Sequence, residues 1–333
     1  MNNPEISIAM CTYNGSAFIV EQLQSIFSQT IPPAEIVIYD DCSQDDTVDV
    51  IEDFIKDSEI PVYLHVNKTN LGFSKNFFQA IKKCTCEYIA LADQDDIWYP
   101  NKLEVLVNEL LKSSEKKLVF SNVEIVNSNN ELMNGTHWEL LNFNEHEIKH
   151  FNSGNELGVL LKRNVISGMS MMFHQSLVSD ETDFHSLWDG YHFDGFLGIK
   201  SALQESSVAI NSTLVRYRQH GANFIGVLPP KSMIGFLFNR VESSAQYLKN
   251  IEHNKLLLDY ISNQSFDPQL CIDKKCQLVQ QKINFYEARL SYPRFIFFRL
   301  LFVLYRFIIG DYHRFSFQSP WKSMLKDILI RYI

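Results

Sequence analysis

The sequence predicts an α/β fold: a mainly parallel, twisted sheet flanked by helices, followed by a C-terminal helical region. Over the first 120 residues, short apolar segments alternate with segments whose apolar residues recur at helical spacing. The apolar segments are continuous, which is typical of strands buried on both faces of a parallel sheet. The composition of the 333 residues, 46% hydrophobic and 21% charged, is that of a globular protein with room for a large core.

The predicted elements follow in order along the chain. Strands are predicted at residues 6–10, 35–39, 61–66, 88–92 and 119–121. Helices are predicted at residues 18–27, 46–55, 73–83 and 100–111, the last opening on Pro100. Residues 122–190 give no clear pattern, and the pattern becomes helical again from Pro229 onward.

Charge is divided unevenly along the chain, whose net charge is −9. Residues 1–225 carry 15 Lys and Arg against 31 Asp and Glu, whereas residues 226–333 carry 15 against 8. Basic and aromatic residues interleave in the C-terminal region, which suits peripheral contact with an anionic membrane better than nucleic acid. The alternative is a helical subdomain or a homo-oligomer interface. The apolar stretch 295–309 is too short and too charged to span a bilayer.

The cysteines and the N-terminus indicate the compartment. Six cysteines in this length do not make a disulfide framework, and no secretory signal opens the sequence. We therefore expect reduced thiols and a cytoplasmic protein, located at the inner face of the cytoplasmic membrane if the basic region binds there. The spacing of Cys84 and Cys86 does not predict a zinc site.

Polar clusters follow three of the predicted strands. They are Thr12-Tyr13-Asn14, Asp40-Asp41 and Asp93-Gln94-Asp95-Asp96. Because ligands bind beyond the carboxyl ends of parallel strands, we expect these clusters to converge on one site. Three carboxylates within four residues repel one another unless a cation lies among them, and oxygen ligands at such a place suit Mg²⁺ or Mn²⁺. A solvated acidic turn is the alternative.

A second possible metal motif lies in the unclear segment. His146-Glu147-Ile148-Lys149-His150 fits the H-E-x-x-H pattern of zinc proteases. That motif requires a helix, and its surroundings are polar, with no apolar companion face. We therefore do not expect a protease.

The motifs taken together indicate a family. Cys11 to Gly15, Asp40 to Thr47, Asn70 to Phe77 and Ala92 to Trp98 occur in this order, with Tyr217 to Asn223 farther on. This set resembles the family 2 glycosyltransferases with a GT-A fold, and most closely the rhamnosyltransferase-like branch that makes bacterial surface polysaccharides. The resemblance covers residues 5–226, and each motif alone would be weak.

The resemblance implies a domain division and a set of roles. Residues 1–226 would be the GT-A catalytic domain, with a Rossmann-like nucleotide-sugar-binding half at 1–120 and an acceptor-binding half at 121–226. Residues 227–333 would be a helical, basic region. The implied donor-binding residues are Thr12, Tyr13, Asn14, Asp41, Lys75, Asp93 and Asp96, with the metal on Asp95 and Asp93. The implied acceptor or diphosphate residues are Trp98, Arg218 and His220. The alternatives are ordinary turn residues for Tyr13 and Asp41, a surface lysine for Lys75, a core tryptophan for Trp98 and a structural loop histidine for His220.

An inverting transfer also needs a base that takes the proton of the acceptor hydroxyl. In the branch it resembles, this base is an aspartate of a His-Asp pair about 23 residues before the Tyr-Arg-Gln-His motif. The count leads to Asp194, although Phe193 stands where the family has histidine. Asp189 is the alternative base.

The resulting hypothesis is an inverting, metal-dependent glycosyltransferase. Its donor would be a dTDP- or UDP-sugar, with dTDP-rhamnose as one candidate. Its acceptor would be a growing or lipid-linked glycan. A sugar nucleotidyltransferase is the first alternative, although no Gly-rich basic phosphate loop lies near the N-terminus. A catalytically inactive protein that binds sugar nucleotides or glycans is the second.

Overall fold

The structure is a computed structural model that describes residues 4–178, 192–221, 244–264, 270–293, 295–316 and 319–329. The chain divides into two compact units. The sheet unit comprises Met1–Gly154, Val165–Glu181 and His192–Val227. The helical unit comprises Asn155–Asn164, Thr182–Tyr191 and Leu228–Ile333. The expected boundary between residues 226 and 227 falls outside the described residues.

Four parallel strands form the first half of the sheet, in the order β3-β2-β1-β4. They are β1 (Ile6–Thr12), β2 (Glu35–Asp40), β3 (Val62–Val66) and β4 (Tyr88–Ala92). The helices between them are α1 (Ile19–Phe27), α2 (Thr47–Ile55) and α3 (Phe73–Lys83). The strands and helices predicted in this part of the chain are confirmed. The carboxyl ends of the parallel strands meet at one edge of the sheet.

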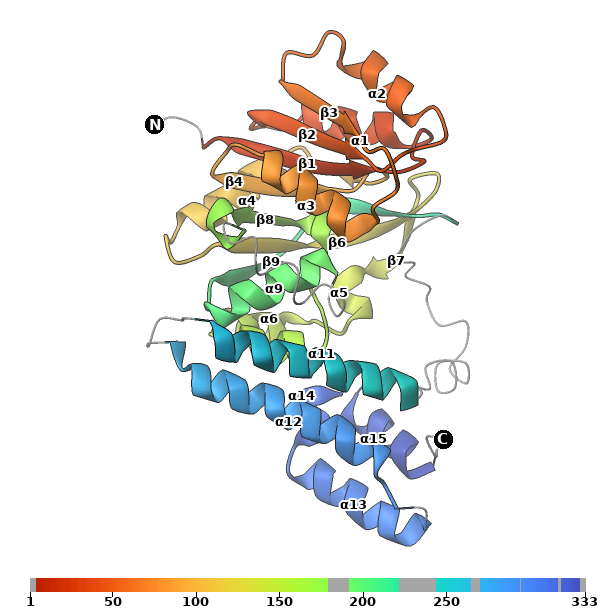
Figure 1. The fold of residues 1–333 in the computed structure, drawn as a ribbon, viewed down its shortest axis with the longest axis vertical. Coiled ribbons are helices and arrows are strands. Elements are labelled where there is room, and N and C mark those ends of the chain that lie inside the picture. The colour runs from red at the N-terminus through yellow and green to blue at the C-terminus, as the bar shows by residue number, and fades with distance from the viewer. Residues whose placement is uncertain are drawn as a thin grey trace. The chain divides into compact units, whose positions relative to one another are not determined.

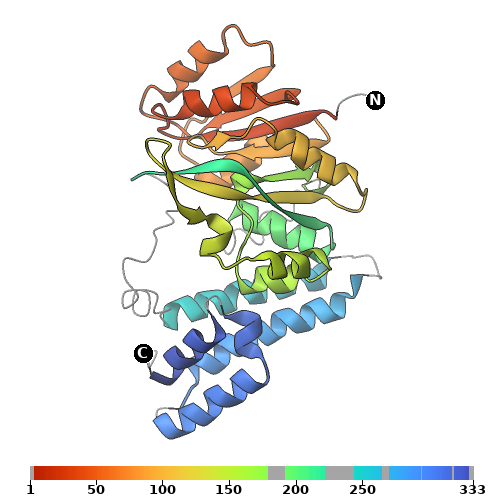
Figure 2. The same cartoon turned by 180° about the vertical axis from the view of Figure 1, so that it is seen from behind.

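The first strand is buried along its whole length because helices cover both faces of the sheet. Its side chains alternate between the two faces. Ile6, Ile8 and Met10 join a core cluster with residues of α1 and of α4 (Lys102–Leu111). Figure 1 shows α3 in front of the sheet, and the view from behind in Figure 2 shows α1, in red, on the opposite face.

The second half of the sheet is mixed. The order continues with β8 (Met171–His174), β6 (Leu118–Asn127), β9 (Ser207–Gln219) and β5 (Ile97–Trp98), while β7 (Leu132–Thr136) pairs with β6. β6 and β9 are parallel, whereas the other pairs in this half are antiparallel. β6 is longer than the apolar residues 119–121 suggest because it shifts register near Asn122 and goes on pairing with β9.

Short elements fill the segment for which the sequence predicts no pattern. In the sheet unit they are α5 (His137–Leu140), α6 (Glu145–Asn152), η1 (Gly168–Ser170) and η2 (Gln175–Leu177), and α9 (Phe193–Leu203) follows. Aromatic contacts hold α5 and α6 against the sheet, because the ring of Phe120 lies 5.6 Å from that of Trp138 and 5.3 Å from that of Phe151. Elements this short are fixed by tertiary contacts and leave little periodicity in the sequence.

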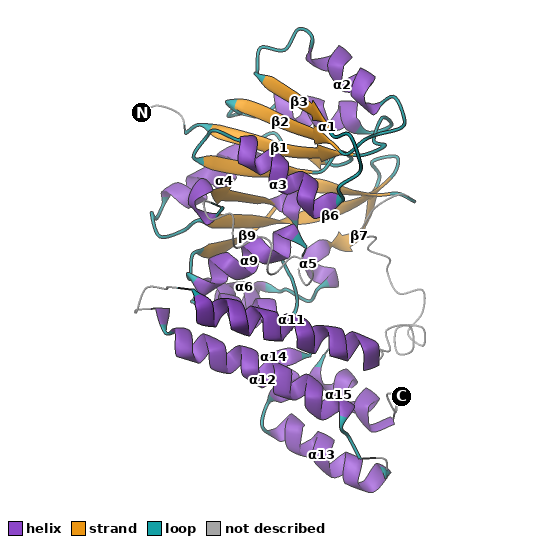
Figure 3. Cartoon of the chain, in the orientation of Figure 1, coloured by secondary structure: helices purple, strands orange, loops and turns teal. Residues whose placement is uncertain are grey.

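The helical unit contains α7 (Glu156–Lys162), α11 (Ser244–Asn263), α12 (Ile272–Leu290), α13 (Ile296–Ile308), α14 (Asp311–Phe315) and α15 (Pro320–Leu329) (Figure 3). The helical pattern predicted from residue 229 onward is thus confirmed for the described residues. A buried ion pair of 2.6 Å joins Arg289 of α12 to Asp327 of α15. Within the described ranges, none of the helices has the length and hydropathy that crossing a bilayer requires.

Candidate functional site

The loops after β1 and β2 are tied together at the carboxyl edge of the sheet. Thr12, the last residue of β1, donates from Oγ1 to Oδ2 of Asp40 at 2.7 Å. Asn14 has φ of 48°, which asparagine tolerates, and its N–H donates to Oγ of Ser43 at 2.8 Å. The side chain of Asn14 accepts from the N–H of Gln44 through Oδ1 at 2.8 Å, so the side chains of Thr12 and Asn14 both hold these loops together.

Gln94 ties the loop after β4 to the loop after β1. Its Oε1 accepts from the N–H of Tyr13 at 2.8 Å, and its Nε2 donates to the carbonyl of Tyr13 at 3.0 Å. Gly15 makes room for this amide, since a Cβ there would lie 2.1 Å from Oε1 of Gln94. Tyr13 is 46% exposed, so its ring can stack on a flat ligand.

Asp41 is buried and holds the loop before α3. Its carboxylate accepts from the N–H groups of Leu71 and Gly72, both at 2.8 Å, and from Nδ2 of Asn67 at 2.9 Å. These bonds occupy much of the hydrogen-bonding capacity of the two oxygens. A nucleotide that contacts Asp41 would therefore share these oxygens with the three N–H donors. Lys75 is exposed in the first turn of α3, where the helix dipole adds positive potential.

Three carboxylates crowd the loop after β4. Burial raises the pKa of Asp93 to about 8, and the carboxylates of Asp95 and Asp194 add to this shift. Burial and the carboxylates of Asp95 and Asp93 raise the pKa of Asp96 well above its ordinary value. Asp96 has no exposed surface, and among the described residues its Oδ2 has no hydrogen-bond partner. Contact between Asp96 and a donor sugar would therefore require its surroundings to move.

A buried lysine lies beside this acidic cluster. Lys102 has no exposed surface, and its Nζ donates to the carbonyl of Met169 at 2.6 Å. The ammonium lies 3.2 Å from the ring centroid of Trp98, a cation–π contact. Burial lowers the pKa of Lys102, while Asp96 and Asp93 oppose that shift. Trp98 is only 3% exposed and belongs to the core cluster, which favours the core alternative over a wall of the acceptor site.

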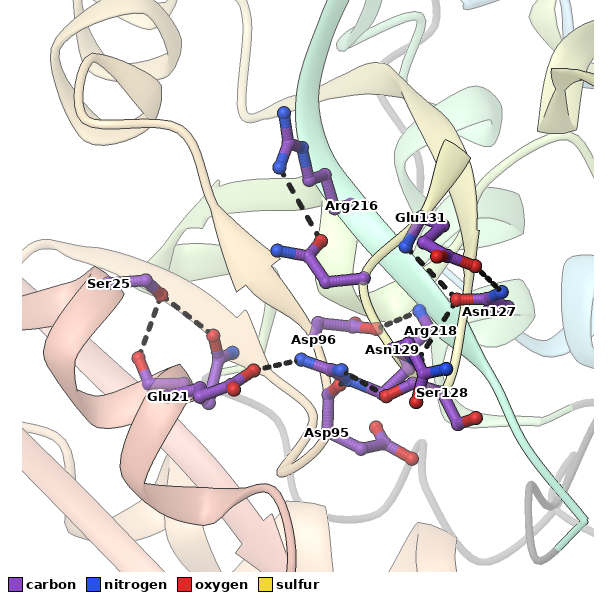
Figure 4. Close-up of polar contacts among 12 residues, drawn as sticks. Glu21, Ser25, Asp95, Asp96, Asn127, Ser128, Asn129, Glu131, Arg216 and Arg218 are labelled. Carbon is purple, nitrogen blue, oxygen red and sulfur yellow. Dashed lines mark hydrogen bonds and ion pairs between the residues drawn. The ribbon is translucent and has the colours of Figure 1, made fainter. Parts of the chain in front are cut away.

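Arg218, in β9, connects the acidic loop with Ser128 and with Glu21 of α1, as Figure 4 shows. Its main-chain N–H donates to Oδ1 of Asp96 at 3.1 Å, and its Nε donates to the carbonyl of Asp95 at 2.8 Å. The guanidinium also donates to the carbonyl of Ser128 at 2.8 Å and pairs with Glu21 of α1. Because Arg218 is 2% exposed, the geometry gives it a bracing role rather than open contact with a diphosphate.

His220 lies directly against the candidate metal ligand. Its Nε2 is 2.8 Å from Oδ2 of Asp95, and its ring packs 4.6 Å from that of Phe18. The structure thus brings together two predicted site residues that are 125 positions apart in the sequence.

Asp194 lies in the first turn of α9. Its Oδ1 accepts from the N–H of Gly195 at 2.7 Å. Burial raises the pKa of Asp194, and its charge in turn raises that of Asp93, so the two carboxylates share one electrostatic site. Asp189, the alternative base, lies outside the described residues.

The carboxylates of this cluster fit a hard divalent cation. The neighbouring carboxylates repel one another and so raise the pKa of Asp93 and Asp96. A cation bound among them would offset this repulsion. Within the described ranges, no group of three or more His, Cys, Asp or Glu side chains is arranged to hold a metal. A Mg²⁺ or Mn²⁺ ion on Asp95 and Asp93 would thus depend on water and ligand phosphates for its other oxygens, as such ions commonly do.

Among the described residues, no group of potential metal ligands includes the H-E-x-x-H segment. It does form a helix, α6, with Ile148 and Phe151 on a buried face, so the expectation that it lacks an apolar face was wrong. His146 and His150 are exposed on the other side, because the buried face belongs to these two apolar residues. This arrangement gives no support to the protease interpretation.

Several residues that shape this site were not among the sequence candidates. Gln22 of α1 donates to the carbonyl of Asp93 at 2.9 Å, and its polar side chain on the apolar face of α1 could have indicated it. Gln94 lies within the acidic motif, in which the carboxylates and not the amide indicate metal binding. Glu21 and Lys102 give no such signal, since charged residues on amphipathic helices are ordinarily exposed.

A comparison with known families agrees with this geometry. The profile of Glycosyl transferase family 2 matches residues 7–180, more than half of the chain. The chain therefore belongs to glycosyl transferase family 2.

Two curated relatives show how far the similarity extends. The chain is 40% identical over 125 residues to the dTDP-rhamnosyl transferase RfbG of Shigella flexneri, a match that covers 36% of this chain and 40% of that protein. It is 27% identical over 249 residues to the UDP-Glc:alpha-D-GlcNAc-diphosphoundecaprenol beta-1,3-glucosyltransferase WfgD of Escherichia coli, covering 72% of this chain and 94% of that protein. The match to RfbG thus spans less than half of either protein.

Solved structures confirm the fold. The S. aureus protein TarS in complex with UDP-GlcNAc has a TM-score of 0.56 at 17% identity, over 97% of this chain and 80% of that one. The mannosyltransferase PcManGT of Pyrobaculum calidifontis, in complex with GDP-Man and Mn²⁺, has a TM-score of 0.51 at 14% identity, over 99% and 86%. At these identities the likeness shows the fold alone, and it confirms the expected GT-A type.

Proposed function

We propose that this family 2 enzyme is an inverting, metal-dependent glycosyltransferase that extends a cell-surface polysaccharide from a nucleotide-sugar donor. One observation carries the proposal. Asp93, after β4, and Asp194, at the start of α9, interact electrostatically, which supports a single site for the candidate metal ligands and the candidate base. An inverting transfer requires both functions on opposite sides of the reacting carbon.

The donor would lie across the loops after β1 and β4. Tyr13 offers an exposed ring on which a pyrimidine can stack. Thr12, Asn14 and Asp41 hold the loops around it. Lys75, exposed at the start of α3, would contact the diphosphate. We propose a dTDP- or UDP-sugar, and rhamnose as the sugar, because the relatives RfbG and WfgD are named for dTDP-rhamnose and UDP-glucose transfer.

Asp95 and Asp93 would hold Mg²⁺ or Mn²⁺, and His220 would orient Asp95 through their 2.8 Å contact. When bound, such an ion stabilises the negative charge of the leaving diphosphate. Arg218 and Gln22 hold the main chain of the acidic loop in place for this role.

Asp194 would take the proton of the acceptor hydroxyl as that oxygen attacks the anomeric carbon. A raised pKa suits a base, since it increases the driving force for proton transfer near neutral pH. The N–H of Gly195 fixes one carboxylate oxygen and so limits the rotation of the group. We propose a lipid-linked glycan at the inner face of the cytoplasmic membrane as acceptor, because the printed acceptor of WfgD carries diphosphoundecaprenol.

The test uses the full chain, Mn²⁺ and a panel that includes dTDP-rhamnose, UDP-glucose and UDP-GlcNAc. A true donor should raise the melting temperature, since a ligand at about 100 times its Kd stabilises the folded state by about 2.7 kcal/mol. That donor should then yield a glycosylated GlcNAc-diphosphate-lipid, a nucleoside diphosphate and an inverted anomeric configuration by NMR. Formation of a nucleoside triphosphate and a sugar 1-phosphate when pyrophosphate is added to the nucleotide sugar would instead indicate a nucleotidyltransferase. Donor binding without transfer or hydrolysis would indicate a binding protein.

A further inference from the structure

The surface of α13 is unusually apolar. Of its 13 residues, 9 are large hydrophobic side chains with at least 36% of their surface exposed. Phe297 is 64% exposed, Leu301 51% and Ile308 80%. Isolated exposed apolar residues are ordinary, but a contiguous set of this size marks a surface that meets a partner.

The exposed residues surround most of the helix. Arg299 and Val303 are buried, and Arg299 anchors α13 by donating to the carbonyl of Pro293 at 3.0 Å. At about 100° per residue, the exposed apolar side chains cover roughly two thirds of the circumference. Only a narrow stripe is left for packing against the rest of the helical unit.

A neighbouring helix enlarges this surface. Trp321 and Leu325, one turn apart on α15, are 61% and 51% exposed. The ring of Trp321 lies 4.5 Å from that of Phe307 of α13, so the two helices form one apolar surface. Figure 2 shows α13 beside α15 at the edge of the helical unit. We call the exposed apolar side chains of α13 and α15 the α13–α15 surface.

The exposed charges of the segment that carries the α13–α15 surface are positive. Arg314 and Lys322 are exposed. The two carboxylates between residues 295 and 329 are those of Asp311 and Asp327, and both are buried. Each forms an ion pair with an arginine at 2.6 Å. An anionic surface would therefore meet cations here and no exposed carboxylate of this segment.

We propose that the α13–α15 surface inserts into the headgroup region of an anionic lipid bilayer and holds the enzyme there as a peripheral protein. A bilayer interface can cover a wide arc of a helix, whereas helix pairing between two copies buries a narrow seam. Phe, Trp and Tyr beside Leu and Ile, with cations at the margin, are the residues that such an interface favours. This anchoring goes beyond the transfer reaction and does not depend on the choice of donor.

The experiment is flotation of the full chain with vesicles of phosphatidylcholine, with or without phosphatidylglycerol. The wild-type chain should float with the anionic vesicles, and high salt should weaken this binding because the Debye length shortens. Phe297→Glu combined with Leu301→Glu should reduce the bound fraction about tenfold or more, since two charges would enter the apolar boundary.

The matched control places the same two charges on exposed apolar residues of the sheet unit, Tyr63→Glu with Leu132→Glu. This variant should float like the wild-type chain. Both variants should transfer sugar to a soluble acceptor at the wild-type rate, which separates anchoring from catalysis. The proposal is wrong if the wild-type chain stays unbound with anionic vesicles or if the α13 variant floats normally. A wild-type dimer in sedimentation that the α13 variant dissociates, without vesicle binding, would assign the α13–α15 surface to a second copy instead.

Discussion

The side-chain amide of Gln94 and the main chain of Tyr13 are joined by two hydrogen bonds of opposite direction, 2.8 and 3.0 Å long. Each residue follows a different parallel strand. The pair therefore connects the loop that carries the acidic cluster to the loop on which the pyrimidine of the donor is proposed to stack. The two halves of a donor site would therefore be positioned relative to each other by one glutamine.

Replacing Gln94 tests this connection. Gln94→Ala removes both bonds, each of a kind that contributes about 0.5–1.5 kcal/mol. We expect donor affinity to fall about tenfold, measured by calorimetry with Mn²⁺ present, because the donor must then order two independent loops. The melting temperature should change little, since the pair is exposed. An unchanged affinity would show that the bridge has no part in donor binding.

Gly15→Ala approaches the same bridge from the other side. The new Cβ would lie 2.1 Å from Oε1 of Gln94, so the flexible amide must move and give up its bonds to Tyr13. We expect the same loss of donor affinity as in Gln94→Ala. The two changes should not add in the double variant, because they break one interaction. Additive losses in that double-mutant cycle would contradict the shared cause.

Asp95→Asn tests the metal. The amide keeps the size of the side chain and a hydrogen-bond partner for His220 but loses the charge that would hold a divalent cation. We expect Mn²⁺-dependent donor binding to disappear and transfer to fall below detection, with the fold unchanged by circular dichroism. Asp53→Asn, at an exposed ion pair with Lys56, is the matched control and should be neutral. Wild-type turnover by Asp95→Asn in EDTA would refute the metal assignment.

The four parallel strands β1 to β4 were predictable because their physical cause is local. Both faces of β1 are covered, so its apolar residues run without interruption, and the run itself is the signal. The polar residues that follow these strands were predictable for a related reason, since parallel strands end at one edge.

The bracing of the site was not predictable, because it depends on partners far along the chain. Arg218 contacts Asp95 and Glu21, which are 123 and 197 residues away in the sequence. A local sequence pattern does not predict contacts over such separations. Lys102 shows the same limit. Its spacing fits an ordinary amphipathic helix, yet the side chain is buried over Trp98. The antiparallel strand β8 could not be predicted from the sequence either, because it is defined by its pairing with β4 and β6.

The histidine at the start of α5 makes a separate prediction about acid stability. Burial lowers the pKa of His137 from 6.5 to about 4, so the folded state binds its proton less readily than the unfolded chain does. The contribution of the neutral ring to stability is complete above pH 6.5 and is lost as the pH falls toward 4. At about 1.36 kcal/mol per pKa unit, the loss amounts to at most about 3 kcal/mol.

Urea unfolding at a series of pH values measures this effect. His137→Gln should flatten the fall in the free energy of unfolding between pH 6.5 and 4. His146→Gln, at an exposed histidine of α6, should leave the slope as it is in the wild-type chain. Equal slopes for the wild-type chain and His137→Gln would show that His137 does not set the acid limit.

Asp194→Asn separates the proposed base from the donor ligands. The amide keeps the acceptor oxygen for the N–H of Gly195 but takes no proton at neutral pH. General-base assistance contributes about 10²–10⁴-fold, so single-turnover transfer should slow by roughly that factor, about 3–5 kcal/mol of barrier. Calorimetric donor affinity should stay the same, because a base acts on the acceptor and its loss appears in the transition state. Asp189→Asn is the control and should transfer normally. If Asp189→Asn is the slow variant instead, Asp194 is not the base, and Phe193 in place of the family's histidine marks the departure.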